Sequence, residues 1–185
     1  MRHRLFSALC LCTAILCCGG CNDSTQSESE PPAIIGQLEL PDGLQFTVPD
    51  GFSAQSSDMY EEYYVKDDAS IIITEEPLEA GYDTAKAYAD RAIEQYTAAT
   101  DTFTLLANTP LDRTDADGRT LEFSYTISVS DHTFSFCSLT GYLLTEDTAY
   151  IITCKAKEET FAAYKPAFET CISGAKPVES EEETT

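Results

Sequence analysis

The sequence predicts an α+β domain, in which an antiparallel β-sheet is flanked by helices as an αβα sandwich with the element order β-β-β-α-β-β-β-β-α. Residues 121–129 alternate apolar and polar side chains, which is the pattern of a half-buried strand. Residues 85–96 repeat apolar side chains every three or four positions, which is the pattern of an amphipathic helix. Segments typical of strands lie on both sides of this helix, so we expect one sheet interrupted by a helical crossing.

Short strands bounded by turn signals are expected before the helix. One of them contains Ile71, Ile72 and Ile73, an uninterrupted β-branched run that is typical of a strand buried on both faces. It should pair with the preceding strand across a turn at Asp67-Asp68-Ala69. The expected strands cover residues 44–49, 62–66 and 70–75, with 52–57 as an optional further strand.

The mid-chain helix is expected to begin after Asp83, a residue type that caps helix N-termini well. An antiparallel meander and a last helix follow. A tight reversal at Asp131-His132 would pair Ser130 with Thr133 and bring two apolar strand faces together. The expected elements are strands at 103–107, 121–129, 133–144 and 150–156 and a helix at 160–173.

The first twenty residues predict an export signal. A short basic start precedes fourteen uncharged residues, 5–18. This stretch is shorter than the roughly 20 apolar residues that span a bilayer. The signal ends in Gly20-Cys21 and resembles the lipobox of bacterial lipoproteins, although Cys18 stands where a Leu is usual. The alternatives are an uncleaved anchor and a fortuitously apolar start.

The lipobox resemblance implies that Cys21 becomes the first residue of the mature chain and is acylated, palmitate included. It also implies an extracytoplasmic location at the cell membrane. A signal peptide at 1–20 would be followed by the lipidated Cys and a flexible acidic, Pro-ending linker at 21–33. We expect a globular domain at 34–176 and a disordered acidic tail at 177–185.

The domain resembles the PsbP-type fold and its DcrB-like bacterial branch. The resemblance rests on the opening Phe46-Thr47-Val48-Pro49-Asp50-Gly51-Phe52, the mid-chain helix, and a closing strand–helix pair with Phe168 near its end. It implies an antiparallel sheet flanked by helices that serves in scaffolding and binding.

The charge balance excludes some partners. The chain has 11 Lys and Arg against 32 Asp and Glu, a formal net charge of −21. Nucleic-acid binding needs a basic face, so it is not expected. The expected partners are the membrane, through the lipid anchor, and an envelope protein or peptide. The domain itself is expected to be a monomer.

Three cysteines follow Cys21, namely Cys137, Cys154 and Cys171. Five strand residues beyond Cys154 advance about 17 Å, and eleven helical residues back to Cys171 return about 16 Å, which favours a disulfide between them. A four-residue loop would put Leu139 opposite Cys154, leaving Cys137 diagonal and about 7–8 Å away. The alternative is three buried thiols.

Catalytic chemistry has little support in this sequence. His132 is the only histidine after the signal, and we expect it to be a solvated turn residue. Glu75 and Glu76 are adjacent in a strand, so they should face opposite sides of the sheet. The tyrosines Tyr60, Tyr63 and Tyr64 predict either an edge strand with partly buried rings or an exposed recognition surface. We expect no enzyme, no metal and no cofactor.

The function that the sequence favours is therefore a non-enzymatic binding module at the cell envelope. The alternatives are an envelope chaperone or assembly factor that holds apolar segments and, less favoured, an enzyme. An apolar sheet face left uncovered by both helices would favour the chaperone. A closed sheet with an exposed tyrosine patch would favour docking, and a deep pocket with convergent carboxylates would favour the enzyme.

Overall fold

The computed structural model describes residues 38–39, 43–57, 60 and 62–178. These residues belong to one structural unit that runs from Gly36 to the end of the chain. The expected signal peptide, the lipid-attachment residue Cys21 and the linker up to residue 33 lie outside the described residues. Neither helix of the described part combines the length and the hydropathy that crossing a membrane requires.

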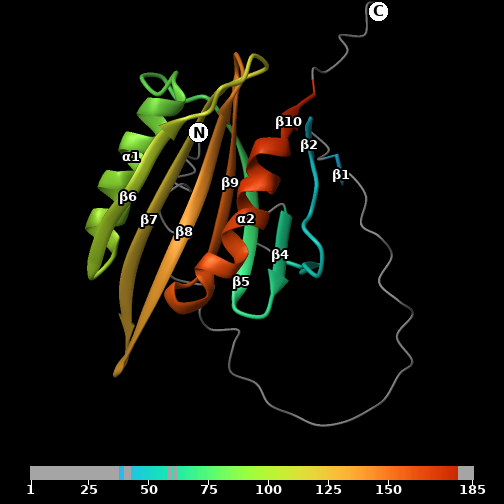
Figure 1. Cartoon of the computed structure of the whole chain (residues 1–185). Helices are drawn as coiled ribbons and strands as arrows, with labels where there is room; N and C mark the ends of the chain where they lie inside the picture. The colour runs from blue at the N-terminus through green and yellow to red at the C-terminus, as the bar shows by residue number, and fades with distance from the viewer. Residues whose placement is uncertain (1–37, 40–42, 58–59, 61, 179–185) are drawn as a thin grey trace, which may run out of the picture. The chain divides into compact units, whose positions relative to one another are not determined.

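The domain is built on a seven-stranded sheet whose neighbours are all antiparallel, so the expected α+β class is confirmed (Figure 1). Among the described residues, five strands precede the first helix instead of the expected three, because β1 (Leu38–Glu39) also forms and β3 (Ser53–Ala54) forms within the optional strand at 52–57. The sheet order is β3 (Ser53–Ala54), β4 (Glu62–Lys66), β5 (Ala69–Pro77), β9 (Thr148–Lys157), β8 (His132–Leu144), β7 (Asp117–Val129) and β6 (Thr102–Pro110).

Two tight hairpins set the register of the long strands. Asp67 and Ser130 have positive φ angles, 50° and 56°, and each opens a two-residue turn. In the β7–β8 pair, Ser128 faces Thr133, so the expected pairing of Ser130 with Thr133 is wrong by two residues. The same faces still meet, because side chains alternate with a period of two.

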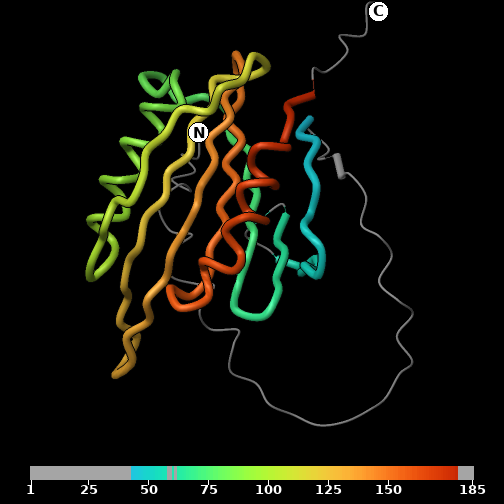
Figure 2. The backbone as a smooth tube through the Cα atoms, viewed as in Figure 1, coloured from blue at the N-terminus to red at the C-terminus, as the bar shows by residue number. Residues whose placement is uncertain are grey.

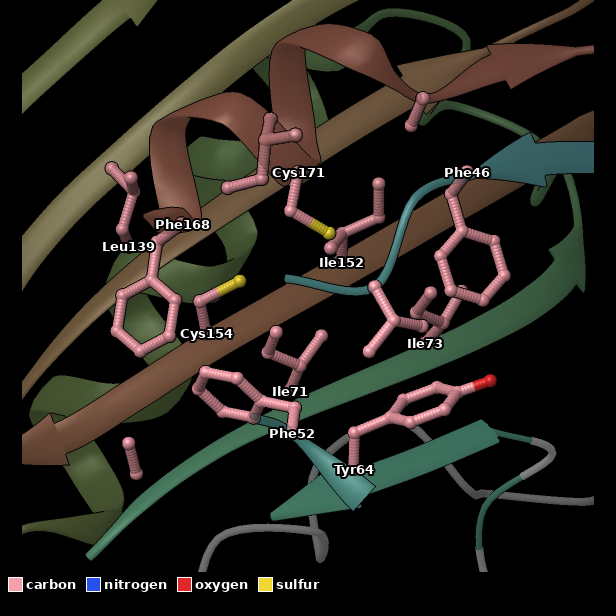
Figure 3. Close-up of a cluster of buried hydrophobic side chains, with 14 of the residues drawn as sticks. Phe46, Phe52, Tyr64, Ile71, Ile73, Leu139, Ile152, Cys154, Phe168 and Cys171 are labelled. Carbon is pink, nitrogen blue, oxygen red and sulfur yellow. The ribbon is translucent and has the colours of Figure 1, made fainter. Parts of the chain in front are cut away.

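One face of the sheet packs against α2 (Glu158–Gly174) and holds the main apolar core (Figure 3). α2 places Phe168 and Ile172, which are at most 1% exposed, over strands β8 and β9. The close approach depends on Gly141, where an added Cβ would lie 2.4 Å from Ile172 Cγ2. The expected burial of Ile71, Ile72 and Ile73 is confirmed, since none is more than 6% exposed.

The opposite face carries α1 (Ala85–Ala99), which packs on β6, β7 and β8. Its N-cap is Thr84, whose side chain accepts a hydrogen bond from the Ala87 N–H, so the expected cap at Asp83 is one residue early. Tyr96 packs against Phe123 with ring centroids 4.3 Å apart. α1 thus covers the β6 side of the sheet.

A second, three-stranded sheet joins the two ends of the domain. Its central strand, β2 (Leu44–Phe46), pairs with β1 (Leu38–Glu39) and with β10 (Lys176–Pro177). The Val178 N–H also donates a hydrogen bond to the Gly43 carbonyl. The acidic tail was expected to begin at Pro177, which is wrong, because Pro177 is part of β10 and lies opposite Leu44.

Candidate functional site

The structure brings two of the three expected cysteines together. Cys154 on β9 and Cys171 on α2 are both buried, and their side chains point into the same space (Figure 3). Both are free thiols in this structure, and each lies close enough to the other to shift its pKa. Burial raises the pKa of the Cys154 thiol. The contact fits the expected bridge, which stays a prediction about the oxidation state of the protein.

Cys137 lies apart from this pair. Leu139 is directly opposite Cys154, as expected for a four-residue loop, so Cys137, two residues before Leu139 on β8, faces Ala156. Its side chain is 6% exposed. Burial raises the pKa of its thiol, which reduces the share of reactive thiolate at neutral pH.

The histidine and the tyrosine group do not form a reactive centre. His132 lies exposed at the β7–β8 hairpin, with its ring 6.5 Å from that of Phe134. Tyr64 is 1% exposed and donates a hydrogen bond to Glu62. Tyr60 packs beside Tyr63 and is 7% exposed. The rings are therefore largely buried, although β4 carries the short strand β3 at its outer side and is not itself the edge.

A buried polar cluster lies beneath the first half of α1. Tyr88 is 3% exposed, and neither its hydroxyl nor Oε1 of Glu76 has a hydrogen-bond partner among the described residues. Arg91 pairs with Glu79 at 2.6 Å instead of with Glu76. As expected, Glu75 and Glu76 face opposite sides of the sheet, since they lie opposite successive residues of β9.

The cluster shifts several ionisations. Burial raises the pKa of Glu76; the positive charge of Arg91 lowers it in part and the nearby Glu79 carboxylate raises it again. Burial and the Glu76 carboxylate raise the pKa of Tyr88 to about 12. These side chains line neither the hollow bounded by residues 133–135 and 157–159 nor the groove beside α2 that is described next. The arrangement is therefore a buried polar contact rather than a substrate pocket.

A groove of about 330 Å³ opens between strands β6 to β8 and the second half of α2. Its floor includes Thr109 and Leu139, and its wall on α2 includes Glu169 and Ile172. Glu122 also lines it and accepts two hydrogen bonds of 2.8 Å from the Lys165 ammonium. The groove is amphipathic, because apolar side chains such as Leu139 and Ile172 line it together with Thr109 and the carboxylates of Glu122 and Glu169.

Strand β6 forms one edge of the sheet in the described part of the chain (Figure 2), and its Ala107 and Thr109 line the groove. β6 is nine residues long and contains no charged residue. Leu105 and Leu106, at its centre, are 44% and 52% exposed. A β-bulge lies between Leu105 and Ala107. We call this edge together with the adjoining groove the β6 corner.

Two acidic side chains frame the β6 corner. Asp101 precedes β6, and Asp112 follows it by two residues; both are exposed. No basic side chain of the described residues forms a salt bridge with either carboxylate. The sequence predicted a strand at 103–107 but not its position at the edge, because strand order across a sheet leaves no local signal.

Comparisons with known proteins identify solved structures that have a similar fold. No family model matches the chain, and no curated protein matches it. Among solved structures, the cyanobacterial PsbP protein CyanoP from Synechocystis sp. PCC 6803 is 14% identical with a TM-score of 0.61, over 82% of this chain and 98% of that one. The Ran-binding protein Mog1p from Saccharomyces cerevisiae is 14% identical with a TM-score of 0.55, over 77% and 94%.

The domain has a PsbP-like fold. A third structure, LpqN from Mycobacterium tuberculosis, described as involved in cell envelope biogenesis, is 10% identical with a TM-score of 0.51, over 77% of this chain and 89% of that one. At these identities the likeness concerns the fold alone, and the site must be argued from this chain's own residues. The expected PsbP-like fold is thus confirmed.

Proposed function

We propose that this chain is a lipid-anchored, extracytoplasmic, non-enzymatic binding module that docks a segment of an envelope protein at the β6 corner. The observation that carries the docking is the edge strand β6, whose central leucines are exposed and whose Ala107 and Thr109 line an amphipathic groove. Contiguous exposed apolar side chains beside a groove are typical of interaction sites. The lipobox-like leader that ends at Cys21 supports the location.

Several observations support a non-enzymatic role. His132, the histidine of the described residues, lies at an exposed hairpin tip and does not line the groove of the β6 corner. The described residues contain no group of side chains that could hold a metal ion. Mog1p, which shares the fold, is described as a Ran-binding protein, so this architecture supports binding in at least one other chain.

The anchor is tested by intact-protein mass spectrometry of the chain extracted from membranes. We expect a chain that begins at Cys21 and carries the added mass of acyl groups. Cys21→Ala should leave the chain unacylated and with its leader uncleaved. A chain that begins with an unmodified Met1 would contradict the anchor.

The docking site is tested by photo-crosslinking in intact cells. A photoreactive residue at Leu106 is compared with one at Val129, which is 40% exposed on the β7–β8 hairpin and serves as the matched control. We expect a discrete crosslinked protein at Leu106 and none at Val129. Equal crosslinking at both positions, or none at Leu106, would contradict docking at the β6 corner.

An envelope chaperone is the second candidate, because α1 does not extend over the whole sheet. On the same face as α1, Tyr63, Val65 and Ile151 are only partly buried, and α1 packs on β6, β7 and β8. Ile72, between them, is only 6% exposed, which limits the apolar area on offer. A chaperone would suppress the aggregation of an unfolded client, and Ile151→Asp should abolish that effect, whereas Leu106→Lys should not.

A further inference from the structure

We propose that the docked segment adds to the sheet as an eighth strand along β6, and that it has an uncharged centre with Lys or Arg at each end. This inference rests on the proposed docking function and specifies the chemistry of the partner. It follows from three properties of the β6 corner, namely its open backbone, its lack of charge and its acidic ends.

The open backbone supplies the affinity. An edge strand presents a row of N–H and C=O groups that have no neighbouring strand. β6 offers such a row over nine residues, whereas the opposite edge, β3, has only two. An extended peptide that pairs with these groups gains main-chain hydrogen bonds, and its alternate side chains enter the pockets beside them.

The lack of charge sets β6 apart from a protected edge. Soluble proteins usually blunt edge strands with charged side chains, with Pro or with bulges. In this chain 23% of the residues are charged, yet β6 has none. The bulge after Leu105 and the terminal Pro110 limit the length that can pair, but they leave the central leucines open.

The two sides of β6 define what the added strand presents. Leu105 faces Phe123 and so lies on the α1 side, where Phe103 also lies. Ala107 faces Glu122 and so lies on the groove side. We expect apolar residues of the partner beside Leu105, and small or polar residues alternating with them over the groove.

The acidic ends select a basic partner over a second copy of this chain. If β6 paired antiparallel with itself around Leu106, residue 101 of each copy would lie opposite residue 111 of the other, so each Asp101 would approach an Asp112. Each end of the pair would then bring two carboxylates together, between chains that each carry a net charge of −21. Basic residues at the ends of a partner strand meet the same carboxylates favourably.

The test uses the full mature lipidated chain in detergent and three fluorescent nine-residue peptides. The first has the sequence Lys-Thr-Val-Thr-Val-Thr-Val-Thr-Lys. The second has Pro at the central position, and the third has Glu at both ends. Fluorescence anisotropy measures the dissociation constant of each peptide at low and at high salt.

We expect the first peptide to bind and the Pro peptide to bind at least about tenfold more weakly, because Pro removes a backbone donor. The peptide with Glu ends should also bind more weakly than the peptide with Lys ends, and high salt should reduce the difference between their dissociation constants. Leu106→Lys should weaken binding of the first peptide as much as the Pro change does, whereas Val129→Lys should leave it unchanged. Asp101→Asn with Asp112→Asn should remove only the preference for Lys ends.

Other results would overturn the inference. Equal affinity for the Pro peptide, or no effect of Leu106→Lys in a chain with unchanged circular dichroism, would exclude strand addition. Concentration-dependent dimerisation that Leu106→Lys abolishes would assign the edge to a second copy. If a cellular protein crosslinks at Leu106 but none of the peptides binds, the docking function stands and strand addition fails. If neither occurs, both fail.

Discussion

The two faces of the sheet are built from different chemistry. Under α2, the core consists of aliphatic and aromatic side chains with three thiols, and Phe168 within it is fully buried. Under the first half of α1, the buried groups include two tyrosines and a carboxylate, and Tyr88 Oη and Glu76 Oε1 have no hydrogen-bond partner in the described part of the chain.

The difference indicates which face provides the stability. Apolar burial stabilises by about 25 cal/mol per Å², whereas a buried polar group without a partner costs about 1–3 kcal/mol. The α2 side should therefore tolerate little change. The α1 side should tolerate more, and some changes there should stabilise the domain. The following predictions test this contrast.

Phe168→Ala should have the largest effect. The side chain is fully buried and contacts the rings of Phe52, Phe161 and Tyr164, so its loss should cost about 3–5 kcal/mol of unfolding free energy. Urea denaturation measures it. On the other face, Tyr88→Phe removes only an unpartnered hydroxyl and should leave the free energy unchanged or slightly raised. Equal losses in the two variants would refute the contrast.

Oxidation of Cys154 and Cys171 should have the next largest effect. A bridge would close a loop of about seventeen residues, worth roughly 3 kcal/mol in the chain-entropy model. Because the Cys21 sulfur would carry the lipid of the proposed anchor, thiol labelling of the unfolded mature chain should then find one free thiol, that of Cys137, and a reductant should lower the denaturation midpoint. Cys137→Ala should leave that reductant effect intact. A count of three free thiols in protein taken from cells would exclude the bridge.

The helix caps should have a moderate effect. Thr84 caps α1 through its side chain, so Thr84→Ala should cost about 1 kcal/mol. Lys157, at the N-cap of α2, makes no side-chain cap hydrogen bond, so Lys157→Ala should cost much less. Thermal denaturation of the two variants compares them directly. A larger loss for Lys157→Ala would show that the cap of α1 is not what holds its first turn.

The ionisation of Glu76 should have the smallest effect. Because burial raises its folded-state pKa, the folded state keeps a proton where the unfolded chain has lost it. Its contribution to stability is therefore greatest below the unfolded pKa and falls as the pH rises through the folded pKa. Glu76→Gln should flatten this part of the pH profile and slightly raise stability at neutral pH, where the buried carboxylate is otherwise charged. An unchanged profile would argue against a shifted Glu76.

The antiparallel meander was predictable because the apolar–polar alternation that defines its strands lies within short stretches of sequence. The alternation through residues 121–129 defines β7, and the facing of Leu139 and Cys154 follows from one loop length. The β7–β8 register was missed by two residues because two-residue turns at neighbouring positions bury the same faces. The positive φ of Ser130 marks the turn that the structure adopts, Ser130-Asp131, instead of the expected Asp131-His132.

The candidate site was less predictable because it depends on tertiary neighbours. The position of β6 at the edge follows from the strand order, which no residue of β6 encodes. β10 was missed because a two-residue strand that contains Pro177 resembles the start of a tail. Glu76 Oε1 has no hydrogen-bond partner among the described residues, and the nearby Arg91 pairs with Glu79, an arrangement that only the folded geometry shows.

The three-stranded sheet has a further consequence for how the chain can be rearranged. β1 and β10 pair with opposite sides of β2, so the beginning and the end of the domain lie about 10 Å apart, two strand spacings. A linker of a few residues could therefore join residue 38 to residue 178. New termini could then be opened in the Asp67-Asp68 turn. Such a circular permutant would move the point of attachment to the other end of the molecule while preserving the core.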